Sequence, residues 1–460
     1  RDLHRLIRRQ RQMCIRDRET YSDADSSKNP AGRGFGGFAT DPETSFWDAN
    51  ARVNYELSPN QKIVFSFYMG DDKLDNSRDV TLVSQEFLAG DPNASSTEGR
   101  INNRIDWGNT GLSASWQENW SNNFFSTITL AYSRFFRDFD RNSIFFTEDE
   151  SDPLDFPRFS LTGGSAEHNR LEDYTVRFHN YLGLSPQHVL EFGAEATRNQ
   201  TRYNFAFRDE IALLDKSIRG WSYGVYVQDT WNPTPRLSLV PGARLNYFEE
   251  TQKFYPDPRI SASFNVTNQV RLKAAGGKYH EFTRRLLRED PLQGDQSFWL
   301  LSDGDTIPVG SSIQATAGGS YETPGLLVDV EGFWKDLKGL SEFGAMRWRR
   351  GQPPEDIDLN DRFFTGTGKS RGVEILFQKK TGMNTGWVTY TLAETEYSFP
   401  DISSTPFPAS HDSLHEFKLV DSHRWNNFTF SGNWVYGCLL YTSDAADELD
   451  GVDLGGRRII

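Results

Sequence analysis

The stretch YGVYVQDTWNPTPRLSLVPGARLNYF, residues 223–248, decides the fold. In its second half, apolar residues occupy positions 237, 239, 241, 243, 245 and 247, and Ser238, Arg244 and Asn246 stand between them. A period of two is typical of a β-strand with one apolar and one polar face. The turn-forming letters NPTP at 232–235 separate the two halves. The stretch therefore predicts a β-hairpin.

The same alternation recurs along the chain. It is clear at residues 63–70, 270–274 and 428–436, where apolar side chains fall on one face and polar or charged ones on the other. Between residues 45 and 437 about sixteen segments show this pattern. Amphipathic strands occur both in soluble β-sandwiches and in outer-membrane β-barrels, so the connections must decide between the two.

Short and long connections alternate. Short turns are predicted at residues 58–61, 121–123, 185–187, 232–235, 267–268, 322–324 and 424–425. Long acidic or polar loops are predicted at residues 73–103, 140–170, 205–217, 280–310, 339–364 and 399–411. Outer-membrane barrels sort their connections in this way, with tight periplasmic turns on one rim and long extracellular loops on the other. The sequence thus predicts an all-β protein, an antiparallel transmembrane β-barrel.

Composition supports this interpretation. Aromatic residues make up 14% of the chain and gather near strand ends, as expected for interfacial girdles. No run of about 18 apolar residues exists for a membrane-spanning helix. The net charge of −14, with no clustered basic surface in the predicted barrel, argues against nucleic acid as a partner.

Both ends of the chain read as foreign to the protein. RRQRQMCIRDR at 8–18 and CLLYTSDAADE at 438–448 match, letter for letter, the translation of a transposon-end sequencing adaptor and of its complement. We therefore interpret residues 1–18 and 438–460 as adaptor-derived and residues 19–437 as one native, partial barrel domain. The alternative interpretation of the first segment is a basic arm for an anionic partner. On the adaptor interpretation, Cys14 and Cys438 carry no thiol chemistry of the protein.

The strands also resemble a known family. The pieces are FWDANARVNYELSPNQKIVFSFYMGDD (46–72), WGNTGLSASW (107–116), LAYSR (130–134), LEDYTVRFHNYLGLSPQHVLEFGAEAT (171–197), YGVYVQDTWNPTPRLSLVPGARLNYF (223–248), PRISASFNVTNQVRLKAAGGKY (258–279) and GTGKSRGVEILFQKKTGMNTGWVTYTLA (366–393). In order and spacing they resemble the barrel of TonB-dependent outer-membrane receptors, particularly the Bacteroidota-like kind with a carboxypeptidase-regulatory-like N-terminal domain.

This resemblance implies a 22-stranded barrel in the outer membrane of a Gram-negative bacterium. An N-terminal plug would occlude the barrel, and the TonB complex would energise it through the plug. The sequence carries neither plug nor TonB box and lacks about five final strands, so we expect this stretch not to fold stably alone. The function implied is import of a large or scarce solute, such as an iron chelate, cobalamin, a glycan or a peptide. A passive porin or a structural or adhesive barrel without a plug is the alternative. Outer-membrane lipid, lipopolysaccharide and a surface lipoprotein are the other partners considered.

Three basic residues stand out as candidate ligand contacts. Arg284, Arg285 and Arg288 form a positive island in the predicted loop His280 to Arg288, and they could contact an anionic ligand or a lipopolysaccharide phosphate. An ordinary surface loop is the other interpretation. Lumen-facing polar residues are expected to line the interior and hold the plug: Arg244, Asn246, Arg271, Lys273, Asp329, Glu331 and Glu374.

Two acidic clusters offer oxygen ligands for Ca²⁺. The candidates are Asp149, Asp152 and Asp155, with Glu148 and Glu150, and Asp356 and Asp358, with Glu355 and Asp361. Their spacing is not that of an EF-hand, and solvated acidic loops are the alternative.

No enzyme is predicted. The chain has no GxSxG, HExxH or Cys/His metal spacing. Gly368-Lys369-Ser370 suggests a phosphate loop, but Phe363 stands where that motif needs its first glycine. A Ser-His pair assembled only in three dimensions is the remaining route to catalysis. No cofactor is expected.

Overall fold

The computed structural model describes residues 42–83, 96–147, 160–207, 211–288, 296–344 and 362–437. In these residues the chain forms twenty β-strands. No helix in the described ranges is long and apolar enough to cross a membrane. The predicted all-β class is confirmed.

Sixteen of the strands form one continuous antiparallel ladder, in which each strand pairs with the next. In order they are β1 (Glu43–Ser58), β2 (Gln61–Asp75), β4 (Ser96–Ser121), β5 (Phe124–Thr147), β6 (Ser160–Ser185), β7 (His188–Phe207), β8 (Ile211–Thr234), β9 (Leu237–Phe248), β10 (Lys253–Asn265), β11 (Val270–Glu281), β14 (Gly310–Glu322), β15 (Leu326–Phe343), β16 (Phe363–Lys379), β17 (Asn384–Ser398), β19 (His415–Trp425) and β20 (Phe428–Gly437). The prediction of about sixteen strands is confirmed.

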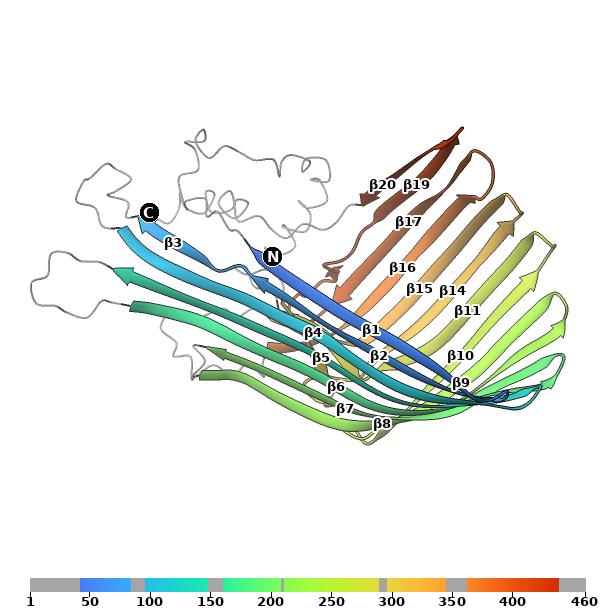
Figure 1. Cartoon of the computed structure of the whole chain (residues 1–460), viewed down its shortest axis with the longest axis horizontal. Coiled ribbons are helices and arrows are strands. Elements are labelled where there is room, and N and C mark those ends of the chain that lie inside the picture. The colour runs from blue at the N-terminus through green and yellow to red at the C-terminus, as the bar shows by residue number, and fades with distance from the viewer. Residues whose placement is uncertain are drawn as a thin grey trace, which may run out of the picture.

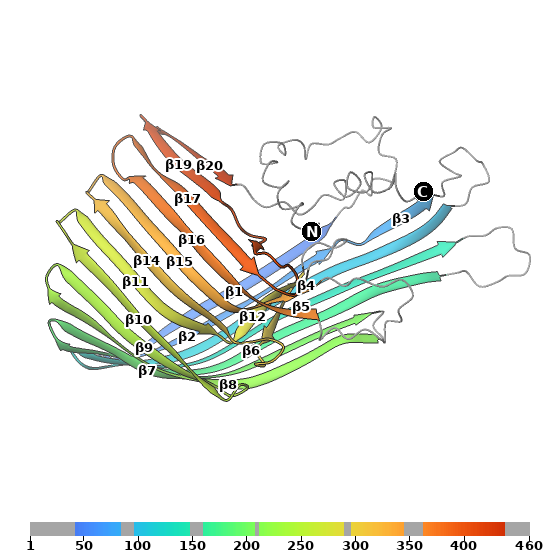
Figure 2. The ribbon, with the colours of Figure 1, turned by 180° about the vertical axis from the view of Figure 1, so that it is seen from behind.

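The ladder curves into an open trough, as Figures 1 and 2 show from opposite sides. β1 and β20 are the two ends of the ladder, and they do not pair with each other within the described ranges. The arc is therefore a wall of a barrel that the described residues leave unclosed.

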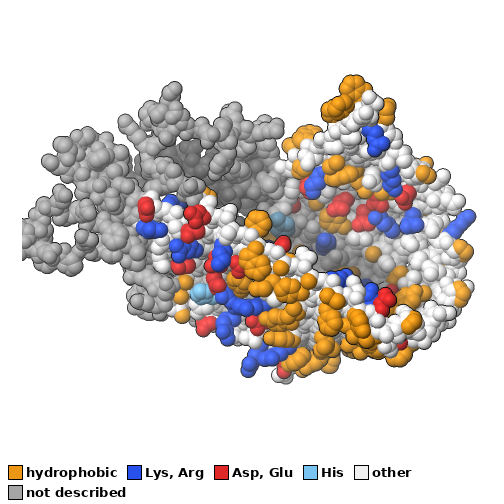
Figure 3. All heavy atoms as spheres, in the orientation of Figure 1, with side chains coloured by type: hydrophobic (Ala, Val, Ile, Leu, Met, Phe, Trp, Pro, Cys, Tyr) orange, Lys and Arg blue, Asp and Glu red, His pale blue; other side chains and the backbone are white. Residues whose placement is uncertain are grey.

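The two faces of the wall differ as the alternation predicts. On the convex face, Leu130 of β5 pairs with Val176 of β6, and these side chains are 53% and 50% exposed. Their neighbours Thr129 and Arg177 pair on the concave face. Figure 3 shows apolar side chains, in orange, gathered on the outer surface of the wall. Apolar side chains that point outward have lipid as their solvent.

Several strands are longer than the sequence predicted. β4 and β6 have 26 residues each, whereas about 9–11 tilted residues cross a bilayer. The predicted loops 73–103, 140–170 and 205–217 are therefore mostly strand, and this part of the prediction is wrong. Apolar alternation ends where the strands leave the membrane, but backbone pairing continues between polar residues such as Arg104 and Asp75.

The alternation of connection lengths is also less strict than predicted. On the rim of the long connections, β9 and β10 are joined by only four residues, 249–252, which were not predicted as a connection. On the opposite rim, the turn at 380–383 between β16 and β17 was likewise not predicted. Both turns lack the Asn-Pro or Ser-Pro signal that marks several of the others.

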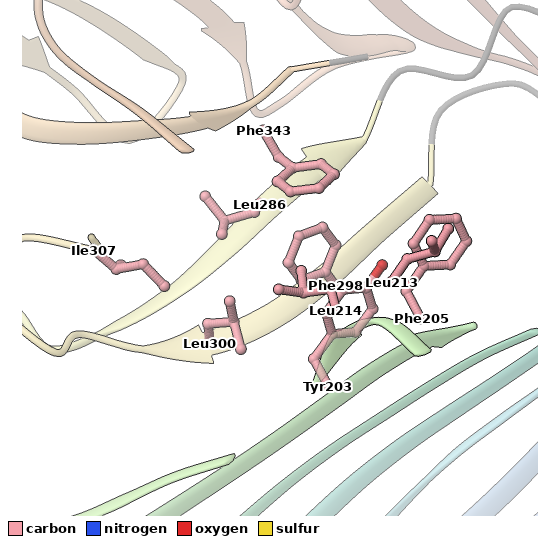
Figure 4. Packing of buried hydrophobic residues seen from close by; sticks show 9 residues of the cluster. All are labelled: Tyr203, Phe205, Leu213, Leu214, Leu286, Phe298, Leu300, Ile307 and Phe343. Carbon is pink, nitrogen blue, oxygen red and sulfur yellow. The ribbon is translucent and has the colours of Figure 1, made fainter. Parts of the chain in front are cut away.

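Four short strands lie outside the main ladder. They are β3 (Arg78–Val83), β12 (Thr283–Arg288), β13 (Gln296–Leu301) and β18 (Phe407–Pro408). β12 and β13 form a hairpin inside the connection from β11 to β14. This hairpin packs on the inner face of β7 and β8, and a cluster of buried apolar residues lies there (Figure 4).

Candidate functional site

A network of charged side chains crosses the concave wall. From β6, Arg177 Nε donates to Glu195 Oε2 on β7 at 2.5 Å. From β9, Arg244 Nη2 donates to the other oxygen of that carboxylate, Oε1, at 3.0 Å. Glu195 thus holds a guanidinium group on each side, an arrangement of charge-assisted hydrogen bonds.

Arg244 reaches Glu195 across an intervening strand. β8 lies between β7 and β9, and its residue opposite Glu195 is Gly224. A Cβ at Gly224 would lie 2.5 Å from Arg244 Nη2 and 2.9 Å from Asn246 Oδ1. The absent side chain at Gly224 therefore provides the space through which β7 and β9 are joined.

The network continues to β11. Arg244 Nε donates to Asn246 Oδ1 at 2.6 Å, and Asn246 Nδ2 donates to Asp257 Oδ2 of β10 at 2.8 Å. Asp257 Oδ1 lies 2.5 Å from His280 Nδ1, and the exposed fractions of the His280 and Asp257 side chains are 7% and 11%. One chain of polar contacts thus links β6 to β11 along the inside of the wall.

A polar hollow of about 490 Å³ opens onto this network. Its floor includes His179, whose Nδ1 lies 2.7 Å from Tyr226 Oη. Arg259 also lines it, and its Nε has no hydrogen-bond partner among the described residues. The complete lining is Thr127, Thr129, Arg177, His179, Glu195, Tyr226, Arg244 and Arg259. The hollow therefore offers both signs of charge to whatever occupies the trough.

The β12–β13 hairpin forms the second feature of the interior. Phe298 of β13 stacks on Tyr203 of β7, with ring centroids 3.9 Å apart. The Phe298 ring also meets the Phe343 ring of β15 edge to face, with the ring centroids 5.6 Å apart. Leu286 and Leu300 complete the apolar contact, as Figure 4 shows. The hairpin thus contacts two parts of the wall that are far apart in the ladder.

Hydrogen bonds fix the position of the hairpin. The side-chain amide of Asn169 on β6 pairs with the backbone of Trp299 as a neighbouring strand would. Its Oδ1 accepts from Trp299 N at 2.7 Å, and its Nδ2 donates to Trp299 O at 2.9 Å. Thr201 Oγ1 accepts from Leu301 N at 3.1 Å. Arg137 Nη1 donates to Ser297 O at 2.9 Å. Side chains of the wall therefore provide hydrogen-bond partners for the backbone groups on the free edge of β13, where a third strand would otherwise pair.

The three basic residues predicted in a loop all lie in a strand. Residues 280 and 281 end β11, and Arg284, Arg285 and Arg288 belong to β12, so the predicted loop is wrong as secondary structure. Arg284 is buried, 8% exposed, and rests on Gly310, where a Cβ would lie 1.7 Å from its Nη2. Burial lowers the pKa of Arg284, and the negative charge of Glu281 opposes that effect. Arg285 is exposed, so the structure does not bring these two side chains to one site.

Other predicted residues have different outcomes. Lys273 lies between two acids, 3.0 Å from Asp329 and 2.9 Å from Glu331. Both acidic clusters, with Asp149, Asp152, Asp155, Asp356 and Asp358, lie outside the described residues. In the described ranges no group of three or more His, Cys, Asp or Glu is placed to hold a metal ion. The calcium sites therefore stay predictions.

Sequence reasoning missed the hairpin and the connection across Gly224. The signal for the hairpin was present in QSFWLL at 296–301, an apolar segment inside a predicted loop. Segments of this kind need an apolar surface to cover them. Nothing in the local sequence marks Gly224, because its role depends on side chains of two other strands.

Comparison with known proteins agrees with this architecture. Residues 46–457 match the family model described as TonB dependent receptor-like, beta-barrel. The match continues past residue 437, beyond the described residues, so the adaptor interpretation of 438–460 stays a prediction. No curated protein matches the chain.

Solved structures of similar fold include the ferripyoverdine receptor of the outer membrane of Pseudomonas aeruginosa bound to ferripyoverdine. The TM-score is 0.52 at 10% identity, over 85% of this chain and 60% of that one. FpvA of P. aeruginosa bound to a heterologous pyoverdine gives 0.50 at 10% identity, over 85% and 60%. The complex of FpvAI with pyocin S2 gives 0.51 at 10%, over 85% and 61%. This chain thus spans about 60% of the length of these structures, and the likeness shows the fold alone.

Proposed function

The chain belongs to the TonB-dependent receptor-like β-barrel family, and from that premise we propose that its protein is an energised importer of a large or scarce solute across the outer membrane of a Gram-negative bacterium. The solute classes are an iron chelate, cobalamin, a glycan or a peptide. The chemistry is binding and conformational work, with no covalent step, and no protein residue acts as a catalyst.

The inner wall is the observation that carries the proposal. A simple water-filled pore needs only polar side chains on its inner face. Here Glu195 pairs with Arg244 and Asp257 accepts from Asn246 along the wall, and Arg259, which lines a hollow of about 490 Å³, has an Nε without a partner among the described residues. Such a surface is suited to polar contacts with a domain that sits inside the barrel, and TonB would act on that plug.

The hairpin supports import in a second way. It occupies space inside the trough near the rim of the long connections, and wall side chains hold it by direct hydrogen bonds. Solutes that enter from that rim meet the hairpin before they meet the hollow. The interior is therefore narrowed on the side from which a solute would arrive, which favours selective binding over free diffusion.

Two measurements test the proposal. The first is long-read sequencing of the source locus across residues 18/19 and 437/438. A preceding plug of roughly 150 residues with a TonB box, the extent expected from the family resemblance, supports import. A signal sequence joined directly to residue 19 contradicts it and indicates a passive pore.

The second measurement is uptake by cells that express the intact protein, with and without a functional TonB complex. The probes are a radiolabelled ferric chelate, cobalamin, an oligosaccharide and a peptide. Import predicts accumulation of one probe only in cells with TonB. Equal uptake of several small probes in both strains would show a porin instead.

A further inference from the structure

A buried carboxylate lies on the outer face of β4, close to the rim of the short turns. Ala114 of β4 pairs with the outward Leu130, so Glu118, four residues further along the strand, also belongs to the outer set. Glu118 is only 6% exposed, and its Oε2 has no hydrogen-bond partner among the described residues. Buried polar atoms in proteins are nearly always hydrogen-bonded. This oxygen therefore lacks a donor that the described part of the chain does not provide.

Two tryptophan rings cover Glu118. Trp116 and Trp120 stand two residues to either side of it, and four residues of extended strand span about 13 Å. Their ring centroids are nevertheless only 6.0 Å apart, with an interplanar angle of 83°. A β-bulge between Asn119 and Ser121 redirects Trp120, as bulges do at the ends of strands. The rings therefore lean toward each other over the carboxylate and form two perpendicular walls.

The nearest hydroxyl group has no hydrogen left for Glu118. Ser126 of β5 is the register partner of Glu118, and its Oγ donates to Asn180 Oδ1 at 2.7 Å. The same Oγ accepts from Trp120 Nε1 at 3.0 Å. A serine hydroxyl carries one hydrogen, so Ser126 accepts from the tryptophan and gives its only hydrogen to the asparagine. The donor for Glu118 must come from outside the described residues.

The chemistry of these groups selects a cation. The face of a tryptophan ring attracts an ammonium group within about 6 Å, and perpendicular aromatic walls are the usual way in which proteins surround one. An ammonium group with N–H bonds also has donors and no acceptor, which suits a carboxylate oxygen that has no donor. Within the described ranges, no Lys or Arg pairs with Glu118 or lies over Trp116 or Trp120. The cation is therefore a ligand.

The depth of the site identifies the source of the cation. Trp120 stands one residue before the end of β4, where the turn 122–123 begins. In the other direction Trp116 pairs with Ile128, an outward residue of the apolar surface that is 37% exposed. Glu118 thus lies between lipid tails and water, at the level where tryptophans meet lipid headgroups. The short turns of an outer-membrane barrel face the periplasm. The headgroups at this level belong to the periplasmic leaflet.

We propose that Glu118, Trp116 and Trp120 bind the primary ammonium headgroup of a phospholipid in the periplasmic leaflet of the outer membrane. One ammonium N–H donates to Glu118 Oε2, and the ring faces surround the charge. Trp120 is 55% exposed, and it is the ring that turns aside to admit the headgroup. The site lies on the outside of the wall, so it goes beyond the import function and takes no part in the solute path.

The carboxylate gives the site a specificity that aromatic rings alone do not have. A quaternary ammonium group carries the same charge as a primary one, but it has no N–H to donate. Both groups gain the attraction of the tryptophan faces. Only the primary ammonium forms a charge-assisted hydrogen bond with Glu118. The site should therefore prefer ethanolamine lipids to choline lipids.

The experiment uses the intact protein, purified in a mild detergent and freed of lipid, with binding measured by native mass spectrometry. The lipid probes are phosphatidylethanolamine, phosphatidylcholine and phosphatidylglycerol with identical acyl chains, and free ethanolamine is the competitor. The test variants are Glu118→Gln and Trp116→Leu. The control for the first is Glu322→Gln, an exposed carboxylate on the same rim that already has Lys380 as a partner. The control for the second is Trp425→Leu, an exposed tryptophan at another short turn.

We expect wild type to bind phosphatidylethanolamine roughly tenfold more tightly than phosphatidylcholine, and phosphatidylglycerol more weakly than either. Glu118→Gln should weaken binding of phosphatidylethanolamine roughly tenfold to a hundredfold and remove its advantage over phosphatidylcholine. Trp116→Leu should weaken binding of both lipids, by roughly threefold to thirtyfold, and leave their order unchanged. Both controls should bind like wild type. The comparison of lipids is made on wild type itself, so it stands even if a variant folds poorly.

Four outcomes overturn the proposal. Equal affinity of wild type for the ethanolamine and choline lipids shows that no N–H bonds Glu118. An unchanged preference in Glu118→Gln shows that the carboxylate does not contact the headgroup. Binding of phosphatidylglycerol as tight as that of phosphatidylethanolamine shows that the wall retains lipid without recognising its headgroup. Displacement of the lipid by millimolar ethanolamine shows a site for a free amine.

Discussion

Arg244 of β9 bonds Glu195 of β7 at 3.0 Å across a strand that lies between them, because that strand carries Gly224 at the crossing point. The contact is unusual for a sheet, where side chains normally meet those of the adjacent strand. It joins β7 to β9 on the inner face, and from the middle strand the Tyr226 ring lies beneath the Arg244 guanidinium group, with its centroid 5.9 Å from Cζ.

Gly224→Ala is expected to break this contact, because the new Cβ would lie 2.5 Å from Arg244 Nη2. The matched control is Gly111→Ala on β4, where a Cβ meets nothing within 4 Å. Alanine loses less chain entropy than glycine on folding, so the control should be slightly stabilised. We expect the Gly224 variant to be less stable than the control by about 1–2 kcal/mol in urea unfolding of the intact protein in detergent. Equal midpoints for the two variants would show that the ion pair contributes nothing.

Asp257→Asn tests the buried end of the network. Asp257 accepts a hydrogen bond from Asn246 Nδ2 and contacts His280 Nδ1, and leaving such buried polar atoms without a partner costs about 1–3 kcal/mol, whereas exposed pairs contribute about 0–1 kcal/mol. Asp229→Asn is the matched control. Asp229 also lies close to a histidine, with 2.7 Å between its Oδ2 and His188 Nδ1, but 41% of the His188 side chain is exposed. Unfolding should therefore occur at lower urea for Asp257→Asn than for Asp229→Asn. The reverse order would contradict the burial argument.

Asn169→Ala tests how the hairpin is held. The substitution removes both hydrogen bonds to Trp299 and leaves buried backbone groups of β13 without partners, at an expected cost of about 2–3 kcal/mol to hairpin docking. Hydrogen exchange at residues 296–301 should accelerate by roughly thirtyfold or more, while exchange in β16 and β17 stays unchanged. Asn142→Ala is the control, because the Asn142 amide donates to the nearby Asp140 and to no part of the hairpin that the structure describes. Unchanged exchange at 296–301 would show that the apolar contacts alone hold the hairpin.

Glu250→Gln tests the short turn between β9 and β10. Burial raises the pKa of Glu250, and the nearby charges of Glu249 and Asp303 raise it further. The folded state therefore binds this proton more tightly than the unfolded chain, so the carboxylate costs stability at neutral pH, and that cost disappears as the pH falls through the raised pKa. At pH 7.5 we expect the unfolding midpoint of Glu250→Gln to lie at a higher urea concentration than that of wild type. At pH 4.5 the difference between the two midpoints should be smaller.

The control for this turn is Asp401→Asn, which removes an exposed loop carboxylate on the same rim. It should shift the midpoint little at either pH. A difference between Glu250→Gln and wild type that grows as the pH falls would have the wrong sign for a raised pKa.

The strands of the membrane belt follow from the sequence, because there lipid on one side and a polar interior on the other impose a period of two. The segment 237–247 is an example, and its predicted faces agree with the structure at Arg244 and Asn246. Outside the membrane both faces of a strand meet water, so apolar and polar residues no longer alternate. The alternation in the sequence therefore ends before the strand does. This is why residues 96–103 were predicted as loop although they belong to β4.

The interior was less predictable for a different reason. The polar character of the inner positions follows from alternation, and Lys273, Asp329 and Glu331 were all expected to face the interior. The particular pairs depend on register between strands that are distant in sequence, such as His280 with Asp257. The buried position of Arg284 depends further on a hairpin that folds back into the trough, and local composition gives no information about that contact.

The hairpin has a mechanical consequence. An arc of antiparallel strands bends easily, because each pair can rotate slightly about its line of hydrogen bonds. β13 is fastened to β7, and β12 meets β15, which lies six strands further along the ladder. The hairpin is therefore a cross-brace between two stretches of the wall. To widen or flatten this arc, a force must break the contacts at one end of the hairpin, either the Tyr203–Phe298 stack with its neighbouring hydrogen bonds or the contact with Phe343.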